Sequence, residues 1–303
     1  MTTFSWMKYL NLCVLLGLML WVTPARALEI TVAAHDSGPA MQAFVDKLAA
    51  ARPRDQVRFI AAADLPHPAQ MKRDSRLILI GPQLLDWRQR TVEGPPTLVL
   101  QVSRVQARTL LDKRQPPGIT LLWSDPPLAR QLNLIRELLP HAQRIGVLYG
   151  NDSGFLINEL RQAAARHDLQ ISAQFWPNSN DTRPLNRLLD YSDVLLGLDD
   201  AQMFNSSTIK TLLLSSYGRR VPLIGPTAAF VRAGSLASSY SGQDEWLNSL
   251  GQLLDRDPQH WPASAYPEFF QIMSNSQVGR SLGIALDDEG ALVRRLEQLE
   301  ASP

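Results

Sequence analysis

Residues 144–165 read RIGVLYGNDSGFLINELRQAAA and show most clearly the pattern from which the fold is predicted. The apolar run Ile145–Tyr149 predicts a buried strand, and the small polar residues of Gly150–Gly154 predict a turn. Apolar residues spaced three to four apart over Asn158–His167 then predict a helix. A strand, a tight turn and a helix in this order make one half of a β-α-β unit, so repetition of the pattern predicts a parallel sheet.

The same pattern recurs on both sides of this stretch. Seven further apolar runs predict strands: Leu28–Ala34, Val57–Ala61, Leu77–Ile80, Thr97–Val102, Ile171–Phe175, Val194–Leu198 and Pro222–Gly225. Helices are predicted at Met41–Ala51, Leu128–Leu139, Ser207–Tyr217, Glu245–Leu254 and Ser276–Leu282, with a late strand at Glu268–Met273. Near-continuous apolar strands indicate that helices cover both faces of a sheet.

The break Pro116-Pro117-Gly118 divides the strands into two groups. It predicts a first sheet over Leu28–Pro117 and a second sheet from Leu121 onward. An eight-stranded barrel could use the same elements, but there are few regular strand–helix repeats, and the proline-rich segment Asp257–Pro267 does not continue them. We therefore expect an α/β fold of two doubly wound parallel-sheet lobes. The first lobe is expected to comprise residues 28–120 with about 240–262, and the second 121–239 with about 266–303.

The first 27 residues have the three parts of a cleavable signal peptide. Lys8 precedes the uncharged run Leu10–Val22, and Pro24 and Ala25-Arg26-Ala27 supply a helix break and an A-x-A cleavage site. The apolar run has 13 residues, whereas a membrane-spanning helix needs about 20, so a permanent anchor is the weaker interpretation. Lipidation of Cys13 is also disfavoured, because Leu, not a small residue, precedes it. We expect cleavage after Ala27 and a periplasmic protein.

Composition narrows the function. Cleavage would remove the only cysteine, so a large apolar core has to replace disulfides as the source of stability. The chain has 30 basic and 29 acidic residues, which leaves no basic footprint for nucleic acid. We expect a monomer that recognises its partners by shape and local chemistry.

Small polar residues gather where the predicted strands end. They are His35–Gly38, Gly81–Gln83, Gly150–Gly154, Asp199-Asp200 and Gly225–Thr227. Any one of these loops is explained by turns and helix caps. Because ligands bind beyond the carboxyl ends of strands in open parallel sheets, the recurrence over five loops predicts a binding edge.

Catalytic and cofactor motifs are missing from the sequence. There is no G-x-S-x-G elbow, no phosphate-binding loop and no dinucleotide-binding glycine pattern. The five histidines have no i,i+4 pair and no cysteine companion, so no metal site or cofactor is expected. A hydrolase using Asp199 or Asp200 remains as an alternative, because adjacent carboxyl groups can have their pKa values pushed apart. Successive strand residues point to opposite faces, however, so one of the two is expected to face the other lobe and the other to cap a helix.

Five aromatic residues are core or rim candidates: Trp123, Phe155, Trp176, Phe204 and Tyr240. One or two of them at a lobe junction could stack on a ligand. Tyr240 is the aromatic candidate for ligand contact.

The stretch Leu138–Gly234 resembles a known family. The resemblance rests on five segments: 139–149 (LPHAQRIGVLY), 159–165 (ELRQAAA), 193–200 (DVLLGLDD), 221–225 (VPLIG) and 231–234 (VRAG), with a similar tail at 275–284 (NSQVGRSLGI). In this order they resemble the substrate-binding proteins of ABC transporters, within the type I periplasmic binding proteins that include tryptophan- and tyrosine-binding members.

The resemblance implies two lobes that close on a small molecule without covalent chemistry, and a membrane permease as partner. It implies three crossings between the lobes, near Gly118–Trp123, Gly234–Tyr240 and Tyr266–Phe270. The family's ligand loops match Asp36, Ser37, Gly81, Asn151, Ser153 and Asp199, and Thr227 and Tyr240 complete the candidate ligand-binding residues.

One segment differs from the family. Before the first crossing, members have a loop reading roughly Asp-Pro-hydrophobic-small-Gly-Leu, whereas Val102–Pro117 here is charged. An alternative function is therefore a periplasmic sensor or interaction module that presents its ligand state to a membrane receptor or kinase.

Overall fold

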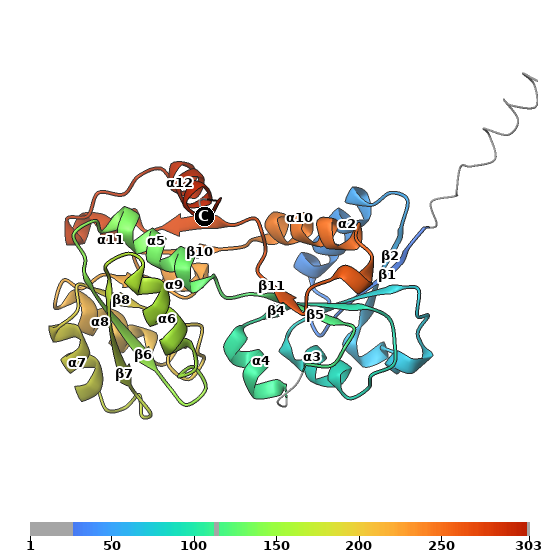
Figure 1. Cartoon of the computed structure of the whole chain (residues 1–303), viewed down its shortest axis with the longest axis horizontal. Helices are drawn as coiled ribbons and strands as arrows, with labels where there is room; N and C mark the ends of the chain where they lie inside the picture. The colour runs from blue at the N-terminus through green and yellow to red at the C-terminus, as the bar shows by residue number, and fades with distance from the viewer. Residues whose placement is uncertain (1–26, 112–114, 302–303) are drawn as a thin grey trace, which may run out of the picture.

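The protein consists of two α/β lobes, which lie side by side in Figure 1. The structure is a computed structural model and describes residues 27–111 and 115–301. The predicted signal peptide lies outside the described residues except for Ala27.

The first lobe is built on a six-stranded sheet in the order β11-β5-β4-β3-β1-β2, in which every pair is parallel. Its elements up to the first crossing are β1 (Glu29–Ala34), α2 (Pro39–Ala51), β2 (Gln56–Ala61), β3 (Arg76–Ile80), α3 (Pro82–Gln89), β4 (Thr97–Val102), α4 (Arg104–Leu110) and β5 (Ile119–Trp123). The chain later returns to supply α10 (Gln243–Leu254) and β11 (Ser264–Ala265).

The second lobe has six strands in the order β12-β10-β9-β8-β6-β7. Its first elements are α5 (Leu128–Leu138), β6 (Arg144–Tyr149), α6 (Leu156–Ala165), β7 (Gln170–Phe175), α7 (Arg183–Asp190), β8 (Val194–Leu196), α8 (Ile209–Tyr217), β9 (Leu223–Ile224), α9 (Ala228–Ala233) and β10 (Ala237–Tyr240). The end of the chain adds β12 (Gln271–Ser274), α11 (Ser276–Leu282) and α12 (Glu289–Ala301). Among the strands of residues 27–111 and 115–301, only β12 runs antiparallel to its neighbour, β10. The predicted fold class is confirmed.

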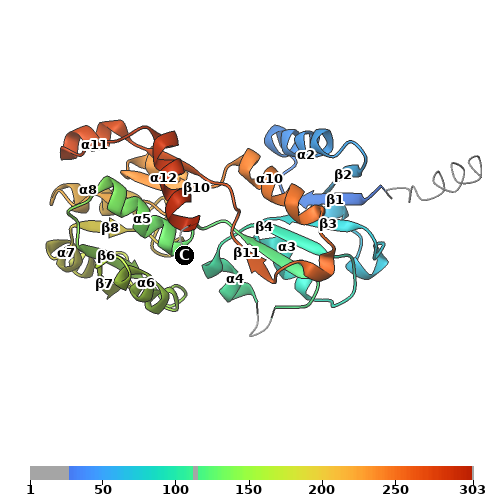
Figure 2. The ribbon, with the colours of Figure 1, turned by 45° about the horizontal axis from the view of Figure 1, so that its top comes forward.

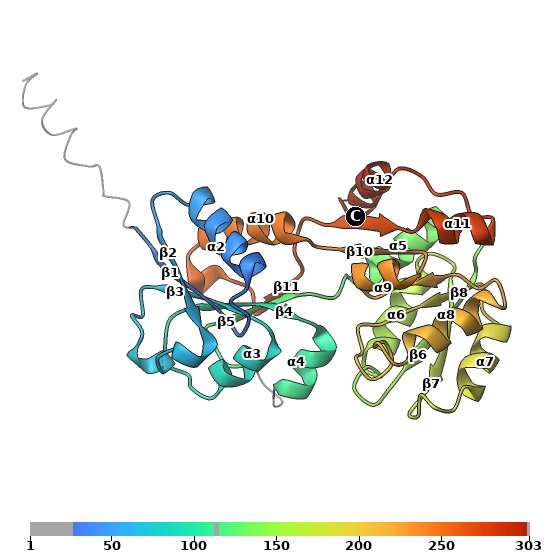
Figure 3. The same ribbon diagram turned by 180° about the vertical axis from the view of Figure 1, so that it is seen from behind.

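Alternating side chains of the first sheet pack into two separate cores. Ile78 and Ile80 of β3 pack with α2 and α10, whereas Leu77 and Leu79 of the same strand pack with α3 and α4. Figure 3 shows these helix pairs on opposite sides of the sheet. Both faces are thus buried, which accounts for the continuous apolar runs in the sequence.

Helix α12 closes the second lobe against α5. Arg130 of α5 is 5% exposed, and its guanidinium donates to both carboxylate oxygens of Glu300 at 2.6 and 2.8 Å. The same guanidinium lies 3.8 Å from the centre of the Phe270 ring, just before β12. Figure 2 shows α12 lying beside the segments that link the lobes. The last helix therefore fixes the end of the third crossing.

Two of the three crossings were predicted at residues that in fact form the strand before the crossing. Residues 119–123 form β5, which pairs with β4 and β11 in the first sheet, so Leu121 does not begin the second lobe and the first crossing is residues 124–127. Residues 237–240 form β10 of the second sheet, and the second crossing follows at Ser241-Gly242. The third crossing, residues 266–270, lies where it was expected.

Candidate functional site

The carboxyl ends of both sheets face each other. Strand β5 ends at the first crossing into the second lobe, and β10 ends at the second crossing back into the first. Because each sheet's main strands are parallel, all of these strands end at the edge turned toward the other lobe. At this junction Ser103, directly after β4, approaches the carbonyl of Asp199, beyond β8, with 3.5 Å between the oxygens. The polar loops predicted to form a binding edge therefore lie on opposed edges.

A cavity of about 630 Å³ opens at the first lobe's edge. It is lined by residues at and just beyond the carboxyl ends of β1, β3 and β4, together with the first turns of α2, the second crossing and the start of α10. The lining residues are Ala34, His35, Asp36, Ala40, Met41, Phe44, Ile80, Gly81, Pro82, Gln83, Leu100, Gln101, Ser241, Gly242, Gln243 and Trp246. We call it the lobe 1 cavity. Its floor is apolar and its rim is polar, which is the usual make-up of a small-molecule site.

Two of the eight predicted site residues, Asp36 and Gly81, line the lobe 1 cavity. Asp36 is exposed, and its carboxylate accepts the Gly38 amide at 2.8 Å, which shapes the turn into α2. Gly81 has φ +105°, a conformation that side-chain-bearing residues rarely adopt, and it precedes Pro82 at the start of α3. Ser37 is exposed between the β1 loop and α2 but is not among the lining residues.

Ser153 and Asp200 support the loop after β6 from inside the protein. Ser153 is fully buried, accepts the Gly150 amide at 3.0 Å and donates to the Asp200 carboxylate. Asp200 is 1% exposed and also accepts the Gln202 amide at 2.9 Å. These bonds hold two loops of the second lobe's edge together, which is a positioning role for both side chains.

The other candidates of the second lobe lie apart from the lobe 1 cavity. Asn151 is exposed on the β6 loop, and Thr227 is partly buried at the start of α9. The Tyr240 hydroxyl donates to Gln271 at 2.8 Å across the β10–β12 pair, and burial raises the pKa of this phenol. In this arrangement of the lobes, the eight residues do not converge on one cavity.

Asp125 of the first crossing and Asp199 of the second lobe lie close enough to interact electrostatically. Asp125 follows β5, is 8% exposed, and accepts the Arg104 amide at 2.8 Å. Burial raises the pKa of Asp125 to about 7, and the negative charge of Asp199 acts in the same direction. Burial also raises the pKa of Asp199 to about 6, with a further contribution from Asp200. Asp125 was not predicted, since nothing near it in the sequence indicates its proximity to Asp199.

Arg104, also not predicted, joins both lobes and two crossings. Its guanidinium donates to Glu159 of α6 at 2.8 and 2.5 Å and to the Tyr266 hydroxyl of the third crossing at 3.1 Å. It also lies 5.7 Å from the centre of the Phe155 ring in the second lobe. Arg104 begins α4, within the segment that differs from the family pattern.

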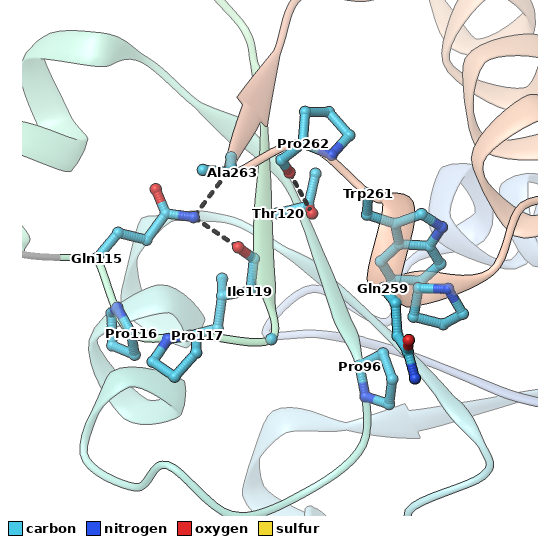
Figure 4. A pocket seen from close by; sticks show the side chains of 12 residues that line it. Pro96, Gln115, Pro116, Pro117, Ile119, Thr120, Gln259, Trp261, Pro262 and Ala263 are labelled. Carbon is cyan, nitrogen blue, oxygen red and sulfur yellow. Dashed lines mark hydrogen bonds between the residues drawn. The ribbon is translucent and has the colours of Figure 1, made fainter.

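A further cavity, of about 480 Å³, lies at the opposite end of the first sheet. Figure 4 shows it walled by prolines and Trp261, with the Gln115 amide donating to the carbonyls of Ile119 and Ala263 at 2.5 and 2.7 Å. Thr120 donates to the Pro262 carbonyl at 2.7 Å. These bonds attach β11 to β5 at the amino-terminal ends of the strands, far along the sheet from the crossings. We assign this cavity to packing of the returning chain.

Within the described ranges, no group of three or more His, Cys, Asp and Glu residues could hold a metal ion. None of the helices in residues 27–111 and 115–301 has the length and apolar character needed to cross a membrane.

Comparison with known proteins gives a family and a fold. The sequence model of the family described as ABC transporter substrate binding protein matches residues 89–246. No curated protein matches the chain. Solved structures similar to the chain include the ligand-free, open form of CD0873 from Clostridium difficile, a substrate binding protein with adhesive properties. It shares 17% identity at a TM-score of 0.65, with 86% of this chain and 97% of that one covered.

Two other structures are similar at the level of the fold. The ABC domain from Streptococcus pneumoniae in complex with L-Trp shares 17% identity at a TM-score of 0.57, covering 88% of this chain and 98% of its own. A conserved domain protein from Vibrio cholerae O1 biovar El Tor shares 19% identity at a TM-score of 0.56, covering 89% and 98%.

Proposed function

The chain belongs to the ABC transporter substrate binding protein family, and on this premise we propose that it is a periplasmic solute-binding protein. Its two lobes close on a small molecule and hold it by hydrogen bonds and apolar contact, without covalent chemistry. The bound solute is then delivered to a membrane permease of an ABC-type uptake system.

The observation that carries the proposal is the position of the lobe 1 cavity. Ser241 and Gly242 line it, and these two residues are also the second crossing between the lobes. A rotation about the crossings therefore changes the shape of the cavity. This couples occupancy of the cavity to the angle between the lobes, as closure around a ligand requires.

Closure supplies the second half of the site. Asn151, Asp199 and Thr227 lie on loops of the edge that faces the lobe 1 cavity. Rotation of the second lobe brings these loops over a solute that already touches Asp36 and Gly81. Ser153 keeps the Asn151 loop in place through its bond to Asp200.

Closure of the lobes also gives a membrane permease a way to recognise the ligand-bound protein. A closed form presents surfaces of both lobes in a fixed relation, and a permease can distinguish it from the open form by that relation alone. We propose that the protein acts as a monomer, since the two halves of its site are carried by one chain.

Isothermal titration against L-amino acids, monosaccharides and polyols tests the function, with small-angle X-ray scattering of each complex. L-Trp belongs in the panel because the similar pneumococcal structure contains it. We expect at least one solute to bind with one-to-one stoichiometry and to reduce the radius of gyration. Asp36→Ala should weaken the binding of that solute, and Asp244→Ala, on the exposed side of α10, should leave its affinity unchanged. If no solute changes the scattering of the protein relative to the ligand-free state, the proposal is overturned.

A further inference from the structure

Gln101 has an unusual backbone conformation for a residue inside a strand. Its φ is +57°, in the left-handed region that non-glycine residues seldom occupy. The pairing of β4 with β5 explains the conformation: Val99 pairs with Leu121 and Val102 with Trp123, so β4 has one extra residue between them. Such bulges redirect a side chain and are frequent beside functional sites.

The other two non-glycine residues with positive φ in the described chain have an ordinary explanation. Asp168 and Arg220 follow helices α6 and α8, where a left-handed residue commonly ends a helix. Gln101 ends no helix. Its neighbours Leu100 and Val102 are 2% and 0% exposed, whereas Gln101 itself is exposed and lines the lobe 1 cavity. The bulge therefore turns this one side chain out of the core and toward the cavity.

The Gln101 carboxamide takes no part in the hydrogen bonding of the described residues. It makes no hydrogen bond to any residue in 27–111 or 115–301, whereas the other polar side chains of β4's neighbourhood, Ser103 and Thr97, are both bonded. A strained backbone that presents an unbonded polar group to a cavity is a recurrent property of ligand sites. The strained backbone lowers stability, and its presence is explained if the carboxamide that it presents binds a ligand.

The rim around Gln101 indicates the kind of group that it recognises. The remaining polar side chains are His35, Asp36, Gln83, Ser241 and Gln243. Of the described residues that line this cavity, none is lysine or arginine. A carboxamide both donates and accepts, so a neutral amide or hydroxyl fits this rim better than an isolated anion. Beneath it Phe44 and Trp246, 8% and 7% exposed, form the apolar floor.

We propose that Gln101 is a specificity-determining residue of the lobe 1 cavity, which reads a neutral amide or hydroxyl group on a solute whose apolar body lies on Phe44 and Trp246. The inference rests on the proposed solute-binding function and assigns the chemistry of its first half-site.

Three small probes that share a phenyl ring and differ in their polar group test the assignment: phenylacetamide, 2-phenylethanol and phenylacetate. Titration by ligand-observed NMR should show that the wild type binds the amide and the alcohol about five- to tenfold more tightly than the anion. Gln101→Ala keeps the backbone conformation and removes the carboxamide, so it should abolish this preference while the phenyl ring still binds.

Thermal unfolding separates recognition from a structural role. Gln101→Ala should leave Tm unchanged within about 1 °C, and Gln101→Gly, which relieves the left-handed strain, should raise it by about 1–4 °C. Arg220→Gly is the matched control: it relieves the same type of strain away from the lobe 1 cavity and should leave all three probe affinities unchanged.

Three results would overturn the inference. They are a fall in Tm for Gln101→Ala, an amide preference that survives in Gln101→Ala, and a wild type that binds none of the probes. A wild type that closes on another solute whose affinity is the same in Gln101→Ala would remove the inference and leave the proposed function standing. Absence of closure with every solute would remove both.

Discussion

Asp125 places a titratable group where the lobes meet. Its folded-state pKa is raised to about 7 by burial and by the charge of Asp199, whereas an aspartate in an unfolded chain titrates near 3.9. Between about pH 4 and pH 7 the folded protein therefore binds more protons than the unfolded one. Stability is greatest at the acidic end of this window and is lost as pH rises through 7.

Asp125→Asn should remove this loss, because the amide oxygen can still accept the Arg104 amide while no charge develops. We expect the free energy of unfolding of the wild type to fall from pH 5 to pH 8 by on the order of 2–4 kcal/mol more than that of the variant. Urea titrations at the two pH values measure the difference. Asp244→Asn, whose side chain is 69% exposed, is the control, and equal pH dependence in wild type and Asp125→Asn would contradict the explanation.

Single residues show how far a sequence can define the site. The position of Asp36 and Gly81 at the lobe 1 cavity could be predicted, because each lies within two residues of the end of a recognisable strand and the ends of parallel strands share one edge. Gln101 is not, because it lies within the run TLVLQV and its left-handed φ depends on pairing with β5. Trp246 reaches the cavity only through the returning helix α10, and the bond between Ser153 and Asp200 joins residues 47 positions apart. Long-range geometry of this kind has no local signal.

Helix α4 connects the lobes at the level of secondary structure. It belongs to the first lobe, yet its Val105 packs into the core of the second lobe and its Arg104 pairs with Glu159 of α6. An ion pair with a half-exposed partner contributes at most about 1 kcal/mol. Its geometric effect is larger, because Arg104 also holds Tyr266 of the third crossing. We therefore expect α4 to restrict the angle between the lobes.

Arg104→Gln should release this restriction. We predict faster hydrogen–deuterium exchange at residues 124–127 and 266–270, a wider distribution of inter-lobe distances, and a Tm lower by about 2–4 °C. Arg108→Gln is the matched control, since Arg108 lies 4.7 Å from the Phe155 ring but takes no part in the Glu159 pair. The exchanged pair Arg104→Glu with Glu159→Arg should restore part of the protection; exchange at the crossings that stays at the wild-type rate in Arg104→Gln would refute the role.

Most elements could be predicted because their apolar patterns are local. The predicted strand Thr97–Val102 and helix Ser276–Leu282 have the observed bounds, and other predicted elements differ by a few residues. Strand β10 was missed because Ala237, Ser238 and Ser239 are fully buried without forming an apolar run. Strand β5 was not predicted, because its residues were expected to form the first crossing. The Pro116-Pro117-Gly118 break lies between α4 and β5 within the first lobe and not between the lobes.

At the scale of the whole molecule, neither lobe is continuous in sequence. The first sheet is completed by β11 and covered by α10, and the second is completed by β12 and covered by α12. The chain therefore crosses between the lobes three times. The segments after residue 241 complete the two sheets and their helical layers.

A fragment ending at Tyr240 should therefore not fold. It lacks Trp246, Leu250, Leu253 and Leu254 of the first core and Leu292 and Leu296 of the second. Burial of each such side chain contributes about 1.5–3 kcal/mol, so the six together contribute about 9–18 kcal/mol, which is as large as the 5–15 kcal/mol by which a domain is stable. We expect no cooperative urea transition and no near-ultraviolet circular dichroism from residues 27–240, and a sharp transition would show that the late segments are dispensable.

The return of the chain to the first lobe also sets the timing of folding. Strand β5 is made about 140 residues before its neighbour β11, and the second sheet waits for Ser274. During synthesis both lobes therefore expose half-covered sheets, the kind of surface that aggregates or binds chaperones. Until the last helices of the chain have been synthesised, we expect the protein to depend on chaperones that keep nascent chains from aggregating.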